Sequence, residues 1–310
     1  MSTLSTSSAF EVLILEDGYY CDLIFTGVPG LPSLGSEIFS SGFNIIPGGA
    51  FNLALAFKRL DLHAGWPCQF GNDLFSRYVA ERAAGEGIDC SLFTHHDFPI
   101  PRITASLSFP QDRAFVTYNH PFSAPPPAEL ILKLRPRFVI EAGLHHGPLH
   151  LASVAAAHQV GALVYMDSDS NDFTLDDPEI FDAIRAVDIF APNAKEALKL
   201  THASTLEEAI DRLGSLVPLL LVKRSCDGAI ARQGKHEVKV APIPVEVFDT
   251  TGAGDCFNAG FLYGQLRGYP LETSLQCANI CGALATTGYG ATAVPTALEL
   301  EARLHTLANL

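Results

Sequence analysis

The sequence has no long hydrophobic run and few basic residues. Its longest strongly apolar stretch, residues 216–222, is interrupted by Pro218 and is far too short to cross a bilayer. Residues 1–10 are rich in Ser and Thr and lack the basic start and apolar middle of a signal peptide. Lys and Arg number 20 against 34 Asp and Glu, giving a formal charge of −14. This balance argues against nucleic acid or an anionic membrane as a partner.

The cysteines form no recognisable metal or redox motif. All seven are dispersed, and no two make a C-x-x-C pair. An odd, scattered set is typical of reduced thiols, so we expect a cytoplasmic protein. Histidines gather at His145, His146 and His150, but no Cys or acidic residue stands at a standard zinc spacing from them. A zinc site is therefore disfavoured.

What the chain does have is an alternation of short apolar strands with helical segments. A chain of 310 residues that is 48% hydrophobic can bury a large core. The alternation implies crossover connections and a mainly parallel sheet with helices on both faces, which is an α/β fold. Ligands gather beyond the carboxyl ends of such strands, where Glu141, Asp167 and Asn193 lie. The predicted strands cover residues 12–15, 138–140, 163–166, 189–191 and 219–222, and helices are predicted at 149–158, 178–186 and 205–213.

One region departs from this alternation. Apolar and polar residues alternate over residues 103–109, which is the pattern of a half-buried strand. Residues 110–113 supply a turn, and residues 114–119 give a second strand. Together with residues 24–26 and 37–44, they predict a small separate β-sheet.

The most informative motif lies near the C-terminus. Residues 249–255 read D-T-T-G-A-G-D, between an extended stretch at 240–248 and a helical stretch at 256–267. The unpaired N–H groups of a helix N-terminus favour an anion, and Gly252, Ala253 and Gly254 let the backbone approach it closely. Asp255 is suited to accept a proton from a hydroxyl that attacks a phosphoryl group. For an isolated G-x-G-D, the alternative is an Asp that merely caps the helix.

The whole string closely resembles the second signature of the PfkB, or ribokinase-like, family of carbohydrate kinases. A G-G-x-x-N motif at Gly48, Gly49 and Asn52 opens an amphipathic helix and resembles the family's first signature. An N-x-x-E motif follows at Asn193 and Glu196, although alone it would be an ordinary capping box. The three motifs stand in the order that the family uses.

The resemblance spans about residues 10–300 and implies the fold. We expect a single ribokinase-like domain over residues 1–310, with a three-layer α/β/α arrangement around a mainly parallel central sheet. The small second sheet would then be the lid that this family folds over the sugar, with strands at about residues 23–45 and 100–120. A homodimer that pairs through the lid is a further expectation.

The resemblance also implies a sugar site. Asp22 stands where the family places an acid after the first strand, and a carboxylate can accept hydrogen bonds from two vicinal hydroxyls. Asn52 offers a donor and an acceptor, and Gly48 and Gly49 leave room for a ring. Glu141 is a candidate hydroxyl contact or a structural acid. Arg102, with Arg113, is the cation in the lid that a phosphorylated acceptor would need.

On the nucleotide side, the resemblance implies ATP and Mg²⁺ as ligands. Lys223, Ser225 and Gly228 are candidates for the ATP loop, where Ser225 replaces the usual glycine. Asn279 and Gly290 lie in the stretch that encloses adenine in the family. The ion-binding candidates are Asn193 and Glu196, which would act on Mg²⁺ through water, and Asp249 and Thr251, at positions that offer oxygens to K⁺ in many relatives.

These implications define the expected activity. A hydroxyl of a small sugar or sugar acid would attack the γ-phosphate of ATP in line, with Asp255 as the general base and the amides of residues 252–254 stabilising the charge. A phosphosugar kinase and a nucleoside kinase of the same family are the alternatives. A sugar-binding relative without catalysis is disfavoured, because such a protein has no need for the base.

Overall fold

The computed structural model describes residues 10–16, 18–109, 113–169 and 172–308, and its largest element is an eight-stranded sheet. Neighbouring strands from β4 to β12 run parallel, while β13 and β14 form an antiparallel edge. In spatial order the strands are β14 (His236–Val240), β13 (Ala229–Gln233), β12 (Leu219–Lys223), β11 (Ile189–Ala191), β10 (Leu163–Asp167), β9 (Phe138–Glu141), β1 (Val12–Ile14) and β4 (Ala64–Gly65). The predicted α/β class with a mainly parallel sheet is confirmed.

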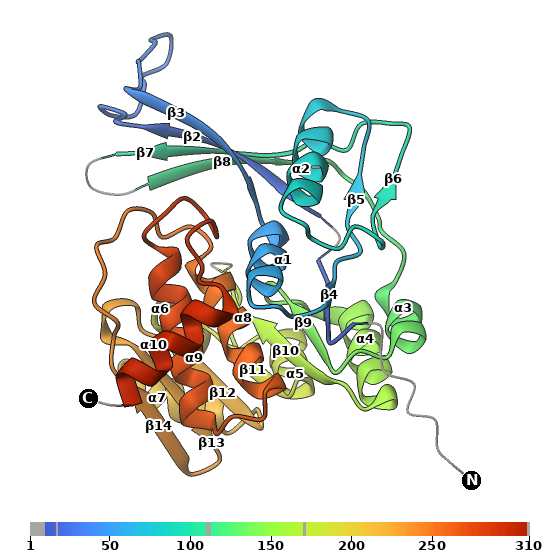
Figure 1. Cartoon of the computed structure of the whole chain (residues 1–310), viewed down its shortest axis with the longest axis vertical. Helices are drawn as coiled ribbons and strands as arrows, with labels where there is room; N and C mark the ends of the chain where they lie inside the picture. The colour runs from blue at the N-terminus through green and yellow to red at the C-terminus, as the bar shows by residue number, and fades with distance from the viewer. Residues whose placement is uncertain (1–9, 17, 110–112, 170–171, 309–310) are drawn as a thin grey trace.

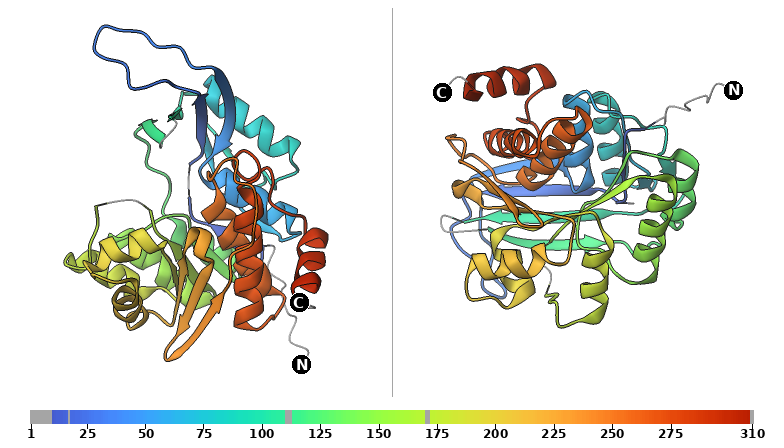
Figure 2. Two further views of the ribbon diagram at one scale, coloured as in Figure 1. Left: turned by 90° about the vertical axis from the view of Figure 1, so that its left-hand side faces the viewer. Right: turned by 90° about the horizontal axis from the view of Figure 1, so that it is seen from below.

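Helices cover both faces of this sheet, so the body has three layers, seen from below in the right-hand view of Figure 2. Successive strand residues feed two separate cores: Ile140 and Tyr165 pack on one side, and Val139 and Met166 on the other. The first core is covered by α1 (Ala50–Arg59), α2 (Leu74–Gly85), α8 (Ala253–Leu266), α9 (Leu271–Ala285) and α10 (Ala297–Ala308). The second is covered by α3 (Pro127–Leu134), α4 (Gly147–Val160), α5 (Pro178–Ala186), α6 (Ala194–Thr201) and α7 (Leu206–Gly214).

The predicted small sheet projects from the top of the body in Figure 1. It has four strands in the order β3 (Gly42–Gly48), β2 (Tyr20–Thr26), β7 (Arg102–Ser108) and β8 (Arg113–Asn119). Strands β7 and β8 agree with the prediction, whereas β2 begins four residues before the predicted residue 24 and β3 begins at residue 42 rather than 37. The predicted turn at residues 110–113 lies mostly outside the described residues.

Burial in this lid sheet does not follow the predicted pattern, in which the apolar face would be buried and the polar face exposed. Residues paired across the strands share a face, so Asp22, Ser106 and Arg113 lie on the face toward the body. Ser106 is buried there, although it belongs to the polar set of β7. The outward face is apolar and includes four exposed side chains, Phe43, Ile45, Val116 and Tyr118.

Helices α8 and α9 form an unusually close pair, which anchors the helix that carries the C-terminal motif. A Cβ at Gly260 would lie 2.7 Å from the carbonyl oxygen of Cys277, and one at Gly264 would lie 2.6 Å from the Cα of Ser274. Only glycine allows this approach. Helix α8 begins at Ala253, three residues before the predicted start, and residues 241–252 are a loop after β14.

Three short elements complete the fold: β5 (Gln69–Phe70) pairs with β6 (Thr94–His95), and a 3₁₀ turn, η1, covers Ser225–Asp227. Across the described ranges, no helix is long and apolar enough to cross a membrane.

Candidate active site

The N-terminus of α8 forms the floor of the candidate site. Gly252 is its cap, with a φ of 74° that favours glycine. The first intrahelical bond runs from the Cys256 N–H to the Gly252 carbonyl at 2.9 Å, so the amides before it are available for an anion. One of the predicted three is partly engaged, since the Ala253 N–H donates to the Thr250 carbonyl at 3.3 Å.

Asp255 lies in the first turn of this helix. Burial, followed by the negative charge of Asp167, raises the pKa of the Asp255 carboxyl to about 7. The positive charge of Lys223 and a hydrogen bond from the Asn52 side chain act in the opposite direction. A carboxyl with a pKa near 7 is well matched to proton transfer at neutral pH.

Asn52, in the first turn of α1, contacts the N-terminus of α8. It is buried, and its Oδ1 accepts a hydrogen bond from the Ala291 N–H at 3.2 Å. A Cβ at Gly252 would approach the Asn52 side chain to 3.0 Å. The Asn52 side chain is therefore bonded to both Asp255 and the loop at Ala291, and its contact with a sugar stays a prediction.

Asp22 follows the first strand, β1, as predicted, and lies inside lid strand β2. Its carboxylate fills the space where a Cβ at Gly48 would be, so glycine is required at position 48. Burial and the neighbouring charge of Asp249 raise the pKa of Asp22 to about 6. Gly49, with a φ of 63°, caps α1 and packs against Tyr20. Gly48 and Gly49 thus let the Asp22 carboxylate and the N-terminus of α1 lie close together.

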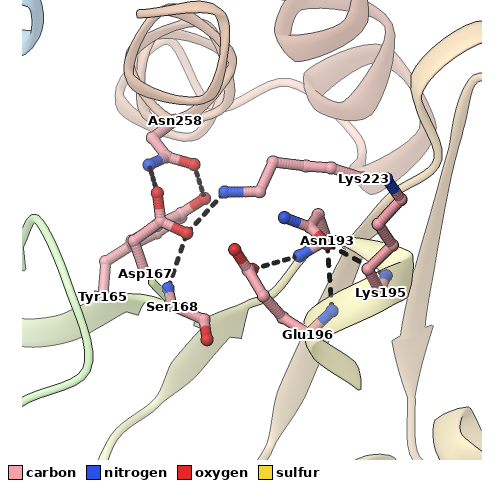
Figure 3. Close-up of polar contacts among 8 residues, drawn as sticks. All are labelled: Tyr165, Asp167, Ser168, Asn193, Lys195, Glu196, Lys223 and Asn258. Carbon is pink, nitrogen blue, oxygen red and sulfur yellow. Dashed lines mark hydrogen bonds and ion pairs between the residues drawn. The ribbon is translucent and has the colours of Figure 1, made fainter. Parts of the chain in front are cut away.

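Asp167, at the end of β10, holds a polar network beside the floor of the site (Figure 3). Its carboxylate forms an ion pair with Lys223 and accepts a hydrogen bond from Asn258 Nδ2 at 2.6 Å. Asn258 Oδ1 in turn accepts from the hydroxyl of Tyr165 at 2.7 Å. A Cβ at Gly254 would lie 3.6 Å from Lys223 Nζ, so the ammonium group lies next to the amides of α8.

Asn193 and Glu196 form a complete capping box at the start of α6. Asn193 Oδ1 accepts from the Glu196 N–H at 3.0 Å, and Glu196 Oε2 accepts from the Asn193 N–H at 2.8 Å. Burial raises the pKa of Glu196 to about 7, with Asp167 and Asp169 adding to the shift.

The side-chain oxygens of Asn193 and Glu196 fit a Mg²⁺ ion whose other ligands are water and phosphate oxygens. The donor set includes a carboxylate, which Mg²⁺ prefers, and Ser168 Oγ is buried without a hydrogen-bond partner among the described residues. No three His, Cys, Asp or Glu side chains in the described part of the chain are grouped to hold a metal by themselves. Water and phosphate oxygens would have to complete the coordination.

The predicted ATP loop keeps the backbone conformation of the usual glycine, although Ser225 replaces that residue. Ser225 has a φ of 53°, the left-handed region that the usual glycine would adopt. A Cβ at Gly228 would collide with the Val240 carbonyl, and Asn279 Nδ2 donates to the neighbouring Ala241 carbonyl at 2.6 Å. The structure therefore brings Gly228 and Asn279 to the same loop.

Gly290 lies elsewhere. Its N–H donates to Asp249 Oδ2 at 3.3 Å, and a Cβ there would lie 3.0 Å from Asn52 Oδ1. It is thus beside the floor of the site, away from the loop that Gly228 and Asn279 share, and the prediction of an adenine contact finds no support.

The predicted contact between Glu141 and sugar is also not supported. Glu141 shares its strand face with Val139, opposite to the face of Asp167 and α8. It is fully buried, and its Oε1 is bonded to His150 Nδ1 at 2.9 Å. The carboxylate therefore contacts α4, which agrees with the alternative of a structural acid.

Neither lid arginine is directed at an acceptor phosphate. Arg102 is buried against Gly18 at the base of the lid and lies 3.9 Å from Glu16. Arg113 Nη1 donates to Asp249 Oδ1 and Thr251 Oγ1, each at 2.8 Å. The two side chains proposed for K⁺ are thus engaged by a guanidinium, and this arrangement does not fit a monovalent ion at these oxygens.

Sequence reasoning missed the network around Asp167. Asp167 was identified only as a residue at a strand end, and Asn258 and Tyr165 were not singled out. The available signal was the position of Asp167 at the carboxyl edge of the sheet, since Asn258 follows Asp255 by one helical turn.

Comparison with known proteins agrees with this geometry. The family described as pfkB family carbohydrate kinase matches residues 40–297. A fructokinase of Vibrio alginolyticus is 27% identical over 283 residues, which are 82% of this chain and 90% of that protein. An uncharacterized sugar kinase of Archaeoglobus fulgidus is 38% identical over 104 residues, but the match covers only 33% of this chain and 41% of that protein.

A solved structure shares the fold. Arabidopsis thaliana ribokinase, complexed with ribose and ATP, superposes with a TM-score of 0.80 at 19% identity, over 96% of this chain and 99% of that one. The lid and the three-layer body are therefore a ribokinase-like arrangement.

The raised pKa of Asp255 predicts a stability change when the carboxyl is removed. A folded-state pKa of about 7 exceeds the unfolded value near 4, so the wild type loses stability as pH rises toward 7. Asp255→Asn cannot ionise and avoids this loss. In urea unfolding, the free energy of unfolding of the variant minus that of the wild type should increase by about 1 kcal/mol or more from pH 5 to pH 8. A difference that stays constant with pH would show that the carboxyl titrates normally.

Proposed function

Because the chain belongs to the pfkB family of carbohydrate kinases, which are ATP-dependent phosphotransferases, we propose that it phosphorylates a hydroxyl of a small sugar or sugar acid. The observation that carries this proposal is the carboxyl of Asp255, with a pKa of about 7, at the N-terminus of α8. A base and an anion site side by side are what phosphoryl transfer to a hydroxyl requires.

Asp255 is proposed as the general base. It accepts the proton of the acceptor hydroxyl while that oxygen forms a bond to the γ-phosphorus of ATP. The bond between this phosphorus and the leaving oxygen breaks, and ADP carries the charge away. Asn52, bonded to Asp255 and to Ala291, keeps the carboxyl directed at the acceptor.

Lys223 and the α8 amides would stabilise the charge on the transferring group. Lys223 Nζ lies next to Gly254 and is held there by its ion pair with Asp167. Fixed donors of this kind cost little reorganisation when the charge develops. Asp167 therefore has two effects: it fixes the lysine and raises the pKa of the base.

Glu196, Asn193 and Asp167 would hold Mg²⁺ through its water ligands, and the ion would supply positive charge to the phosphate oxygens. The loop that includes Ser225 and Gly228, with Asn279 behind it, is the proposed nucleotide side. The sugar side would be formed by Asp22 on the lid, with Gly48 and Gly49 close to it.

A neutral sugar is favoured over a phosphosugar. A second phosphate needs cations, and the two lid arginines are engaged with Glu16 and with Asp249. Asp22 lies beside Gly48 and close enough to Asp249 to be affected by its charge, and a carboxylate there would suit hydroxyl groups. Nothing in the site favours a nucleoside. A protein that binds sugar without catalysis would have no use for the costly burial of Asp255.

The decisive assay measures ADP release with a panel of free sugars, sugar acids, sugar phosphates and nucleosides. We expect turnover with a free sugar or sugar acid, and Asp255→Asn should lower kcat by ~10²–10⁴-fold while ATP still binds. Asp182→Asn is the matched control, because Asp182 is an exposed residue of α5. Retention of more than about a tenth of wild-type kcat by Asp255→Asn would exclude its role as the base. Turnover confined to sugar phosphates or nucleosides would overturn the choice of acceptor.

We also propose that two copies pair through the outward face of the lid. Phe43 and Ile45 on β3 and Val116 and Tyr118 on β8 expose apolar side chains on the two outer strands of this face, and Val116 is 67% exposed. Sedimentation velocity should find a dimer that Val116→Glu dissociates, whereas Leu132→Glu on α3 leaves it intact. A wild type that remains monomeric at tens of micromolar, the usual range for such measurements, contradicts the pairing.

A further inference from the structure

Arg113 connects the lid to the loop that leads into α8. It is the first residue of β8, and its guanidinium donates to three side chains of the D-T-T-G-A-G-D motif. Nη1 lies 2.8 Å from Asp249 Oδ1 and 2.8 Å from Thr251 Oγ1, and Nη2 lies 2.6 Å from Thr250 Oγ1. Three bonds from one side chain therefore reach a segment more than a hundred residues away in the sequence.

This segment determines the shape of the anion site. The Thr250 carbonyl accepts from the Ala253 N–H, so Thr250 is directly bonded to the first turn of α8. Thr251 is folded onto Asp249, whose Oδ1 accepts from the Thr251 N–H at 3.1 Å and from its hydroxyl at 2.9 Å. A shift of these residues would move the amides of Gly252 and Ala253.

Asp249 is the charged centre of these contacts. Its side chain is only 11% exposed, and its charge acts on Asp22 across the site. Two buried carboxylates close together are unfavourable unless a cation accompanies them. Arg113, itself 30% exposed, is the cation bonded to Asp249 here.

An ordinary surface ion pair would look different. Such pairs are solvated on both sides and contribute little. Here the carboxylate is nearly buried, the guanidinium makes two further bonds, and the partners belong to separate structural units, the lid and the body.

We propose that Arg113 is a positioning residue that takes the place of a monovalent cation at Asp249 and makes the shape of the anion site depend on the lid being docked. The proposal rests on the kinase activity proposed above only for its kinetic test. Lid strand β8 carries the charge, so the loop at 249–251 is fully held only when the lid lies against the body.

Two measurements on Arg113→Ala, Arg113→Lys and the control Arg303→Ala, an exposed arginine of α10, test this inference. Thermal unfolding in KCl and in tetramethylammonium chloride at equal ionic strength needs no activity. The wild type should have the same midpoint in both salts, while Arg113→Ala should be more stable in KCl, because K⁺ can then reach the oxygens of Asp249 and Thr251.

Kinetics with the accepted sugar provide the second measurement. Arg113→Ala should lower kcat about tenfold or more with smaller changes in both KM values, because the anion site acts on the transition state. Arg113→Lys should recover part of the loss, and Arg303→Ala should behave as wild type.

The outcomes separate the two proposals. A wild type that K⁺ stabilises selectively, or an Arg113→Ala enzyme with kcat within twofold of wild type, would overturn the role of Arg113 while leaving the kinase intact. A wild type without turnover on any acceptor, but with the expected salt behaviour of both proteins, would refute the proposed kinase activity and leave the cation role supported.

Discussion

The cost of burying acidic groups constrains the whole site. Asp22, Glu196 and Asp255 all have a raised pKa because they are withdrawn from water. Lys223 forms an ion pair with Asp167, whose charge acts on Glu196 and Asp255. Arg113 forms an ion pair with Asp249, whose charge acts on Asp22. Each cation comes from a different element, so the sheet, the lid and α8 must be assembled before the carboxyls acquire these properties.

Sequence patterns were sufficient for the frame. The strands at residues 189–191 and the helix at 178–186 have the predicted bounds, since short apolar runs and caps are local signals. The C-terminal motif also lies where it was expected, at the junction of a loop and α8. The glycines there have a physical reason that can be read locally, because position 252 requires a positive φ.

Local sequence patterns could not predict side-chain direction or strand register. A pattern of period two does not reveal which face meets the body, and the buried residues of β7 are the polar Arg102 and Ser106. Glu141 and Asp167 both end parallel strands, yet they point to opposite faces, one to His150 and the other to Lys223. The contact of Arg113 with Asp249 depends on the docking of two separate units, which no local pattern contains.

We propose that burial, and after it the negative charge of Asp167, sets the proton affinity of Asp255 for catalysis at neutral pH. The pH dependence of kcat/KM for the acceptor in wild type and Asp167→Asn tests it most directly, because this ratio reports the free enzyme. We expect a wild-type limb that rises with its midpoint near pH 7 and levels off above it, and that moves to lower pH in Asp167→Asn, where a negative charge is lost. A wild-type rate that is flat through this range, or a limb that the substitution leaves in place, would contradict it.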